Sequence, residues 1–160
     1  MEQEEVIARL EAMPERLRVA FATAGAGAAD RAPSPGEWSA QELLAHIRSV
    51  DALLAPYIVL LTVLEKPAFS GADERALAER AGYLEDDVET ALTAFTTRRG
   101  ELVRLLKRLN AADRQRESVH TAYGRFTIAD YAAHLAAHEQ EHLPEVERAL
   151  GVGEGAVGHG

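Results

Sequence analysis

The sequence predicts an all-α protein built as a four-helix bundle. Four long segments place apolar residues at the 3.6-residue period of an amphipathic helix, and no segment of comparable length alternates strictly as a strand would. Each helix then has one apolar face that must be covered, and four helices around a common core satisfy all of them. The connection after the second segment is long enough for a crossover, so simple up-down-up-down order is not required.

The first predicted helix covers residues 2–23 and is followed by a loop rich in Gly and Pro. Pro14 has no backbone N–H to donate, so we expect it to kink the helix or to split it near Met13. The apolar stripe of this helix consists of Val6, Leu10, Met13, Leu17 and Phe21.

The second predicted helix has a clear start. Ser39 is followed three residues later by Glu42, a capping box, and Trp38 and Leu43 occupy the positions of a hydrophobic staple. The helix should end near Glu65, shortly before a proline. Its buried stripe is predicted to comprise Leu43, Ile47, Val50, Leu54, Ile58 and Leu61.

Two more long helices complete the predicted bundle. Residues 66–82 form a connection with one short helix, and residues 83–109 form the third long helix. The connector 114–126 contains a Tyr123-Gly124 turn signal. Thr127, with Asp130 three residues on, then caps a fourth helix over residues 127–150. We expect residues 1–150 to form a single domain and the glycine-rich tail 151–160 to be flexible.

Charge argues against nucleic acid as a partner. The chain has 17 Lys and Arg against 26 Asp and Glu, for a formal net charge of -9 at pH 7. A protein that binds phosphate backbones needs a basic surface, because counterion release supplies most of its non-specific affinity. We therefore expect no nucleic-acid partner.

The composition also limits chemistry and location. The chain has no cysteine, which excludes thiolate zinc sites, redox pairs and a cysteine nucleophile, so a metal would need nitrogen and oxygen ligands. The first 25 residues carry five Glu, unlike a signal peptide, so we expect a cytoplasmic protein. The longest uncharged apolar run, residues 52–64, is shorter than the roughly 20 residues of a membrane span, so we expect no membrane association.

Three of the six histidines lie on one face of the predicted fourth helix. His134, His138 and His142 follow at steps of four residues. Two imidazoles one turn apart can reach the same cation, whereas the rise of about 12 Å from first to third is too long for all three. A third ligand must come from another helix, and His46 lies on the apolar side of the second. His46, His138 and His142 are therefore the candidate ligands of a divalent transition metal, with zinc or nickel favoured and iron or copper compatible.

Simpler interpretations of these residues remain open. His46 alone could be a hydrogen-bonded core residue, and the HxxxH pair alone could lie on a solvated face. His134 could contact a substrate or solvent, and His120 belongs to a polar connector that could fold over the end of the bundle. Glu42 could orient the ring of His46, although its capping role already explains it. No catalytic acid or base can be named.

Two segments, residues 35–54 (PGEWSAQELLAHIRSVDALL) and 123–143 (YGRFTIADYAAHLAAHEQEHL), resemble the DinB-like superfamily of damage-inducible four-helix-bundle proteins. The resemblance covers most of the chain in the order and length of its elements. It implies a divalent metal held by one His early in the second helix and an HxxxH pair in the last. Those positions fall on His46, His138 and His142.

The resemblance also implies an activity. Some relatives are metal-dependent transferases that add bacillithiol, mycothiol or glutathione to electrophiles. We therefore expect a metal-dependent transferase acting on a small thiol and a small electrophile. The alternatives are a non-catalytic metal-binding stress-response protein, a metal-dependent hydrolase, and a helical bundle with polar core histidines and no metal. Family habit also leaves a homodimer open.

Overall fold

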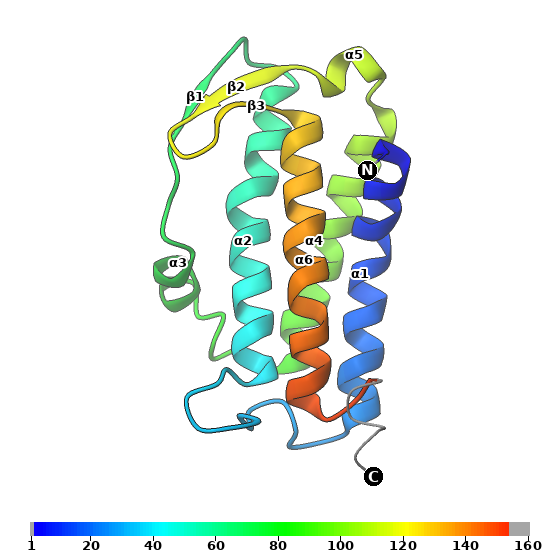
Figure 1. Ribbon diagram of the computed structural model, residues 1–160, viewed down its shortest axis with the longest axis vertical. Helices are drawn as coiled ribbons and strands as arrows, with labels where there is room; N and C mark the ends of the chain where they lie inside the picture. The colour runs from blue at the N-terminus through cyan, green and yellow to red at the C-terminus, as the bar shows by residue number, and fades with distance from the viewer. Residues whose placement is uncertain (1, 154–160) are drawn as a thin grey trace.

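The computed structural model describes residues 2–153, and four long helices form a bundle (Figure 1). These helices are α1 (Gln3–Ala24), α2 (Ala40–Leu61), α4 (Val88–Arg108) and α6 (Ile128–Leu150). The shorter elements are β1 (Ala68–Phe69), α3 (Glu74–Arg80), α5 (Ala111–Arg114), β2 (Glu117–His120) and β3 (Gly124–Thr127). Most of the predicted flexible tail, residues 151–160, lies outside the described residues.

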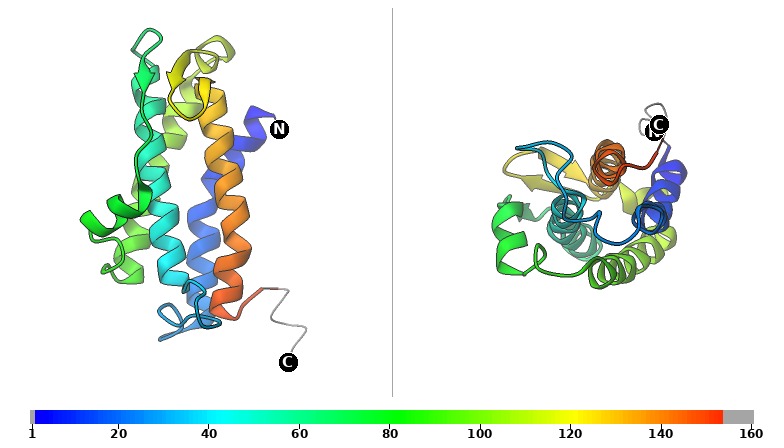
Figure 2. Two further views of the ribbon diagram at one scale, coloured as in Figure 1. Left: turned by 60° about the vertical axis from the view of Figure 1, so that its left-hand side comes forward. Right: turned by 90° about the horizontal axis from the view of Figure 1, so that it is seen from below.

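The predicted crossover after the second long helix is confirmed. After α2, the chain returns along the outside of the bundle through β1 and α3, so α4 runs in the same direction as α2 (Figure 1). Seen along the bundle axis in Figure 2, α1 and α2 occupy diagonally opposite corners, and each packs against both α4 and α6. The pair α2 and α6, which carries the candidate ligands, is therefore a pair of direct neighbours.

A small sheet is the main departure from the predicted all-helical chain. β1 pairs in parallel with β2, and β2 pairs antiparallel with β3. The strands have two, four and four residues, too few for a period-2 pattern to stand out. The Tyr123-Gly124 turn signal marks the hairpin, where Gly124 has a φ of 70°. Nothing in that segment indicates its pairing with the distant β1.

Two predicted helix ends differ from the structure by a few residues. α2 ends at Leu61 instead of near Glu65, because Arg116 donates from Nε to the Leu61 carbonyl oxygen at 2.6 Å and so caps the helix. α4 begins at Val88 instead of residue 83, because the Asp87 carboxylate accepts a hydrogen bond from a backbone N–H of the first turn. The two predicted capping boxes, at the starts of α2 and α6, are both present.

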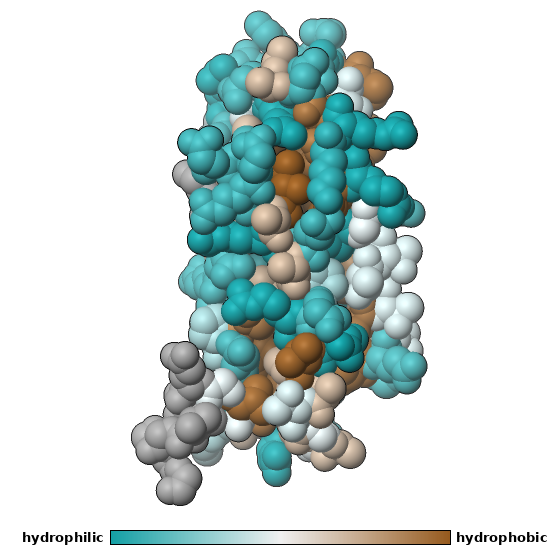
Figure 3. Space-filling view, turned by 90° about the vertical axis from the view of Figure 1, so that its right-hand side faces the viewer, coloured by the Kyte–Doolittle hydropathy of each residue, from teal (hydrophilic) through white to brown (hydrophobic). Residues whose placement is uncertain are grey.

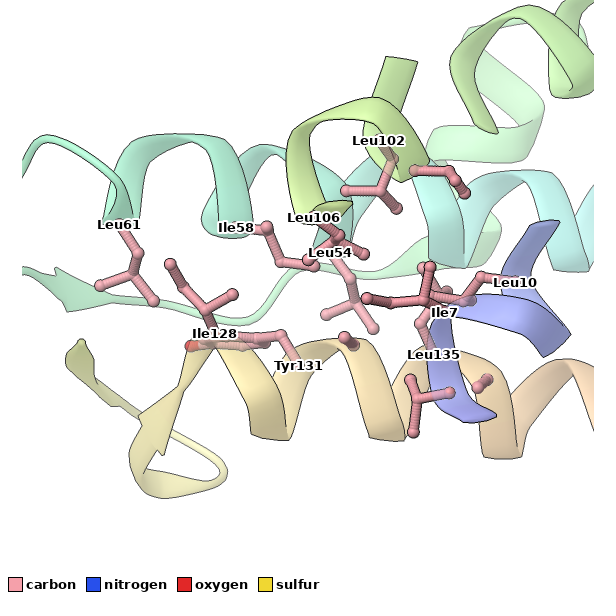
Figure 4. Close-up of a cluster of buried hydrophobic side chains, with 14 of the residues drawn as sticks. Ile7, Leu10, Leu54, Ile58, Leu61, Leu102, Leu106, Ile128, Tyr131 and Leu135 are labelled. Atoms are coloured by element: carbon pink, nitrogen blue, oxygen red, sulfur yellow. The ribbon is translucent and has the colours of Figure 1, made fainter. Parts of the chain in front are cut away.

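The apolar core extends along the bundle axis. The predicted stripe of α1 is fully buried, and in α2 only Val50 of the predicted stripe is left partly exposed. Figure 4 shows the cluster near the sheet end, where side chains from α1, α2, α4 and α6 meet. Burial of each such Leu or Ile stabilises the fold by about 1.5–3 kcal/mol.

The apolar character of α2 reflects this central position. By length and composition α2 could cross a membrane, with a mean hydropathy of 1.5 over its most apolar window. Half of that window is buried inside the bundle, and a single helix of this kind is weak evidence for a membrane span. Figure 3 shows one outer face, hydrophilic over most of its area with a narrow strip of apolar side chains.

A charged network lies in the middle of the bundle. Arg99 of α4 donates from Nη1 to Glu139 of α6 at 2.7 Å and from Nη2 to Asp51 of α2 at 3.0 Å. All three side chains are almost completely buried. Burial raises the pKa of Glu139 to about 7, against the opposing effect of Arg99. Because one cation faces two carboxylates, Arg99 stays charged and Glu139 takes up a proton readily.

The same arginine explains why Pro14 does not split α1. The helix continues unbroken from Gln3 to Ala24, so of the two outcomes expected at Pro14, a kink or a split near Met13, the split does not occur. Pro14 cannot donate to the carbonyl oxygen of Leu10, four residues earlier. Arg99 Nη1 donates to that oxygen instead, at 2.9 Å. The network therefore connects all four long helices.

Replacement of the central arginine should strongly destabilise the protein. We expect Arg99→Met to lower the free energy of unfolding by about 3–5 kcal/mol, because two carboxylates remain buried without their cation. Lys107→Ala is the control, since Lys107 pairs with Glu11 on the surface and both side chains are about half exposed. The control should lose less than about 1 kcal/mol in urea unfolding. Equal losses in the two variants would contradict a structural role for the network.

Candidate metal centre

Three histidine side chains converge between α2 and α6. One ring nitrogen of each of His46, His138 and His142 lies within 4.8 Å of those of the other two. The Nε2 atoms of His46 and His138 are 2.9 Å apart. Two imidazole nitrogens that bind one metal at about 2.0–2.1 Å would be about 3.0 Å apart at a 90° angle and about 3.4 Å apart at a tetrahedral angle. The nitrogens of His46 and His138 therefore have the spacing of two ligands of a single ion, and a ring nitrogen of His142 lies within 4.8 Å of both.

Helix geometry accounts for the convergence. His138 and His142 are one turn apart on α6, and their ring centroids are 4.4 Å apart. His46 lies two turns into α2, and its ring centroid is 4.8 Å from each of the other two. The structure thus brings together the three residues that the sequence analysis selected.

The environment favours the neutral form of two of these imidazoles, His138 and His46. Burial lowers the pKa of His138 to about 3, and the neighbouring rings of His142 and His46 add to this shift. Burial and the proximity of His142 also lower the pKa of His46. A neutral ring has a lone pair available for a cation, so the site is suited to a metal without prior loss of protons.

A carboxylate supports one member of the trio. Glu145 Oε2 lies 2.8 Å from Nδ1 of His142, which orients the ring and leaves Nε2 for a metal. The sequence analysis missed Glu145, although its position three residues after His142 is a usable signal. Of the two roles open to Glu42, the structure shows the capping box of α2, and Glu42 makes no hydrogen bond to His46 within residues 2–153. His138 has no such support, since its Nδ1 is buried with no hydrogen-bond partner in the same range.

A cavity of about 380 Å³ opens beside the trio. Its walls come from α2, α6, the turn between β2 and β3, and the segment that joins β1 to α3 (Figure 1). The Tyr57 hydroxyl donates to the carbonyl oxygen of Ser70, which ties that segment to α2. The volume is in the range of small-molecule sites, so a substrate can lie next to a bound metal.

The two other histidines within residues 2–153, His120 and His134, line the cavity away from the trio. His134 is exposed, lines the cavity, and has its Nε2 3.4 Å from the hydroxyl oxygen of Tyr123. His120 is buried in the cavity wall at the end of β2, since the connector folds over the cavity. Neither belongs to the trio.

Comparison with known proteins identifies the family. Residues 9–146 match the DinB superfamily. The chain belongs to the DinB superfamily. Among solved structures, YfiT from Bacillus subtilis has the same fold, with a TM-score of 0.76 and 22% identity over 94% of this chain and 89% of YfiT. YfiT is described as a probable metal-dependent hydrolase with an unusual four-helix bundle topology. No curated protein matches the chain.

Metal binding by this DinB-superfamily chain should depend on His138. We expect untagged wild-type protein, incubated with zinc or nickel and desalted, to retain about one equivalent of metal. His138→Ala should lose the metal, because only two ligands would remain, His46 on α2 and His142 on α6. His134→Ala is the matched control, since it makes the same change one turn earlier on α6 and should retain the metal. Equal metal contents by elemental analysis in the two variants would contradict the assignment.

Acid should destabilise the metal-free protein through His138. The folded pKa of His138 is depressed below its ordinary value of 6.5, so the stability contributed by the neutral ring is present above pH 6.5 and is lost as the pH falls toward 3. We expect the free energy of unfolding to fall more steeply from pH 6.5 to 4 in wild type than in His138→Leu. The limit for one proton is about 1.4 kcal/mol per pH unit, and solvent screening makes the observed slope smaller. Parallel slopes would contradict this account.

Proposed function

We propose that the protein is a metal-dependent transferase that adds a low-molecular-weight thiol, of the bacillithiol, mycothiol or glutathione class, to small electrophiles. The supporting observation is the trio of imidazoles at the edge of a cavity that a small molecule can enter. Three histidines leave at least one coordination position open, as in catalytic sites. Zinc or nickel is our proposed metal, and iron or copper is also compatible with imidazole ligands.

A divalent metal in this site would hold a thiol as its thiolate and so supply a strong nucleophile near neutral pH. The residues of the chain have separate tasks. His46, His138 and His142 would bind the metal, and Glu145 orients the ring of His142 through its contact with Nδ1. Because the chain has no cysteine, the sulfur must come from a co-substrate.

The cavity wall supports this pairing of substrates. The ring of Tyr57 stacks on Phe69 with centroids 4.4 Å apart, and the ring of Tyr123 stacks on Phe126 at 4.8 Å. Tyr57 and Tyr123 both line the cavity, so they offer aromatic surface to an apolar electrophile beside the metal. We place the reaction in the cytoplasm, where such thiols are kept reduced, with no nucleic-acid or membrane partner. A homodimer remains part of the proposal.

Hydrolysis is the second candidate. The carboxylate of Glu74 lines the same cavity and could take a proton from an attacking water. The description of YfiT as a probable hydrolase favours the same reaction. This candidate predicts turnover of an ester or amide without any thiol, and loss of that turnover in Glu74→Gln.

The decisive experiment is a thiol-dependent assay. We expect zinc- or nickel-loaded protein to accelerate the reaction of monochlorobimane or chlorodinitrobenzene with at least one of the three thiols. His138→Ala should react at the uncatalysed rate, because the metal is lost. Metal-loaded wild type that accelerates the reaction with none of the three thiols would contradict the transferase proposal. Bound metal without turnover of either kind would indicate a non-catalytic metal-binding protein.

A further inference from the structure

His120 occupies a defined position in the cavity wall. It is the last residue of β2, pairs with Phe69 of β1 in the sheet, and is only 3% exposed. Its ring stacks on Tyr123 with centroids 4.4 Å apart and meets the ring of Tyr57 edge-on at 5.6 Å. The sheet and the two tyrosines therefore hold the imidazole in one orientation.

Backbone hydrogen bonds determine which ring nitrogen carries the proton. Nδ1 of His120 accepts from the backbone N–H of Ala122 at 3.0 Å and from that of Tyr123 at 3.4 Å. A ring nitrogen that accepts cannot carry a hydrogen, so in the neutral imidazole the proton resides on Nε2. Burial lowers the pKa of His120, which favours the neutral ring. His120 is thus a donor through Nε2 only.

This donor has no acceptor within residues 2–153. Nε2 of His120 is not among the buried side-chain atoms that lack a partner, so it is open to the cavity that the ring lines. Gly71 leaves room beside the ring, since a Cβ built there would lie 3.6 Å from Cε1 of His120. An N–H that is open to a cavity can donate to a bound molecule and fix its orientation.

The donor is set apart from the metal ligands. Tyr123, on which His120 stacks, packs against His134, one turn before His138 on α6. The ring of His120 is also 6.3 Å from that of Tyr131, about two turns before His138. The residues of α6 that His120 and Tyr123 approach thus precede His138 by about 6–10 Å along the helix, on the wall of the same cavity.

That separation distinguishes between reactions. When an ester or amide is hydrolysed, negative charge develops on the oxygen of the attacked carbon, next to the nucleophile. When a thiol adds to a carbon–carbon double bond conjugated to a carbonyl group, the charge moves along the conjugated chain to an oxygen remote from the attacked carbon. A donor away from the metal ligands fits the second case.

We infer that His120 donates a hydrogen bond from Nε2 to the carbonyl oxygen of the electrophile, so that the site selects electrophiles conjugated to a carbonyl group. This inference rests on the proposed thiol transfer. The thiol loses its proton to solvent, and sulfur forms a bond to the alkene carbon farther from the carbonyl group. The alkene π pair moves to form a double bond between the nearer alkene carbon and the carbonyl carbon, and the carbonyl π pair moves onto the oxygen. His120 stabilises that oxygen until a proton from water adds to the nearer alkene carbon and the carbonyl group re-forms. The thiol S–H has then added across the double bond.

Two variants separate the donor from the structural role of the ring. In His120→Asn, the side-chain oxygen can still accept from the backbone N–H two residues on, as in an Asx turn. The amide nitrogen of Asn then lies near the position of the ring Cδ2, so its N–H groups do not reach the position of Nε2. In His120→Gln, the side-chain amide places an N–H near the position of Nε2. Both variants should keep the wild-type metal content and a similar melting temperature.

The test measures binding first. The probe is benzylacetone, which has a carbonyl group and an aromatic ring but no reactive double bond. In NMR titrations of zinc-loaded protein, we expect His120→Asn to weaken its binding about threefold to tenfold and His120→Gln to bind it nearly as wild type does. Imidazole nitrogen spectra of the wild type should show a protonated Nε2 in His120. Unchanged affinity in His120→Asn, or a protonated Nδ1, would overturn the inference whatever the protein catalyses.

The reaction provides the second measurement. With a thiol that supports turnover, kcat/KM for benzalacetone should fall about 100-fold in His120→Asn, because an oxyanion donor is lost. Reaction with benzyl chloride, which places no charge on an oxygen, should change by less than about twofold. Equal losses for both electrophiles would overturn the inference. If benzylacetone binding depends on His120 but no thiol adds to benzalacetone, the donor is supported and it is the proposed transfer that fails.

Discussion

The buried ion network of Arg99 is the interaction on which the site depends. It joins α4 to Asp51 on α2, to Glu139 on α6 and to a backbone carbonyl of α1, so it sets how the helices lie against one another. Asp51 lies little more than one turn after His46, and Glu139 directly follows His138. Because α2 and α6 are held together at these points, they have little freedom to slide along each other. The candidate ligands on the two helices therefore stay opposite each other.

Neighbouring residues of α6 therefore serve two different faces of the helix, about 100° apart. Glu139 is buried toward Arg99, whereas His138 points to His46 and the cavity. Core packing fixes the first face, and the candidate metal ligands on the adjacent face inherit that rigidity. The small sheet then closes the cavity and contributes the aromatic wall and His120. The bundle thus supplies the candidate metal ligands. The crossover between α2 and α4 and the connector before α6 supply much of the surface that a substrate would meet.

Local pattern predicted the bundle and the trio, and long-range pairing accounts for what was missed. Apolar periodicity and capping boxes identify the long helices, and the spacing of His138 and His142 identifies two candidate ligands, because each signal lies within one helix. Arg99 has the same local appearance as an exposed helical arginine, so neither its burial nor its compensation for Pro14 can be anticipated. The pairing of β1 with β2 is equally nonlocal, and without it His120 has no place in the cavity wall.

X-ray absorption of the zinc-loaded protein, with and without the thiol that supports turnover, tests the central claim most directly. The account predicts three nitrogen ligands at about 2.0–2.1 Å, and one sulfur at about 2.3 Å that appears only when the thiol is added. Because the chain has no cysteine, a sulfur at that distance would come from the co-substrate. Zinc with fewer than three imidazole ligands would contradict the metal centre, and an intact centre that never acquires sulfur would contradict the transferase.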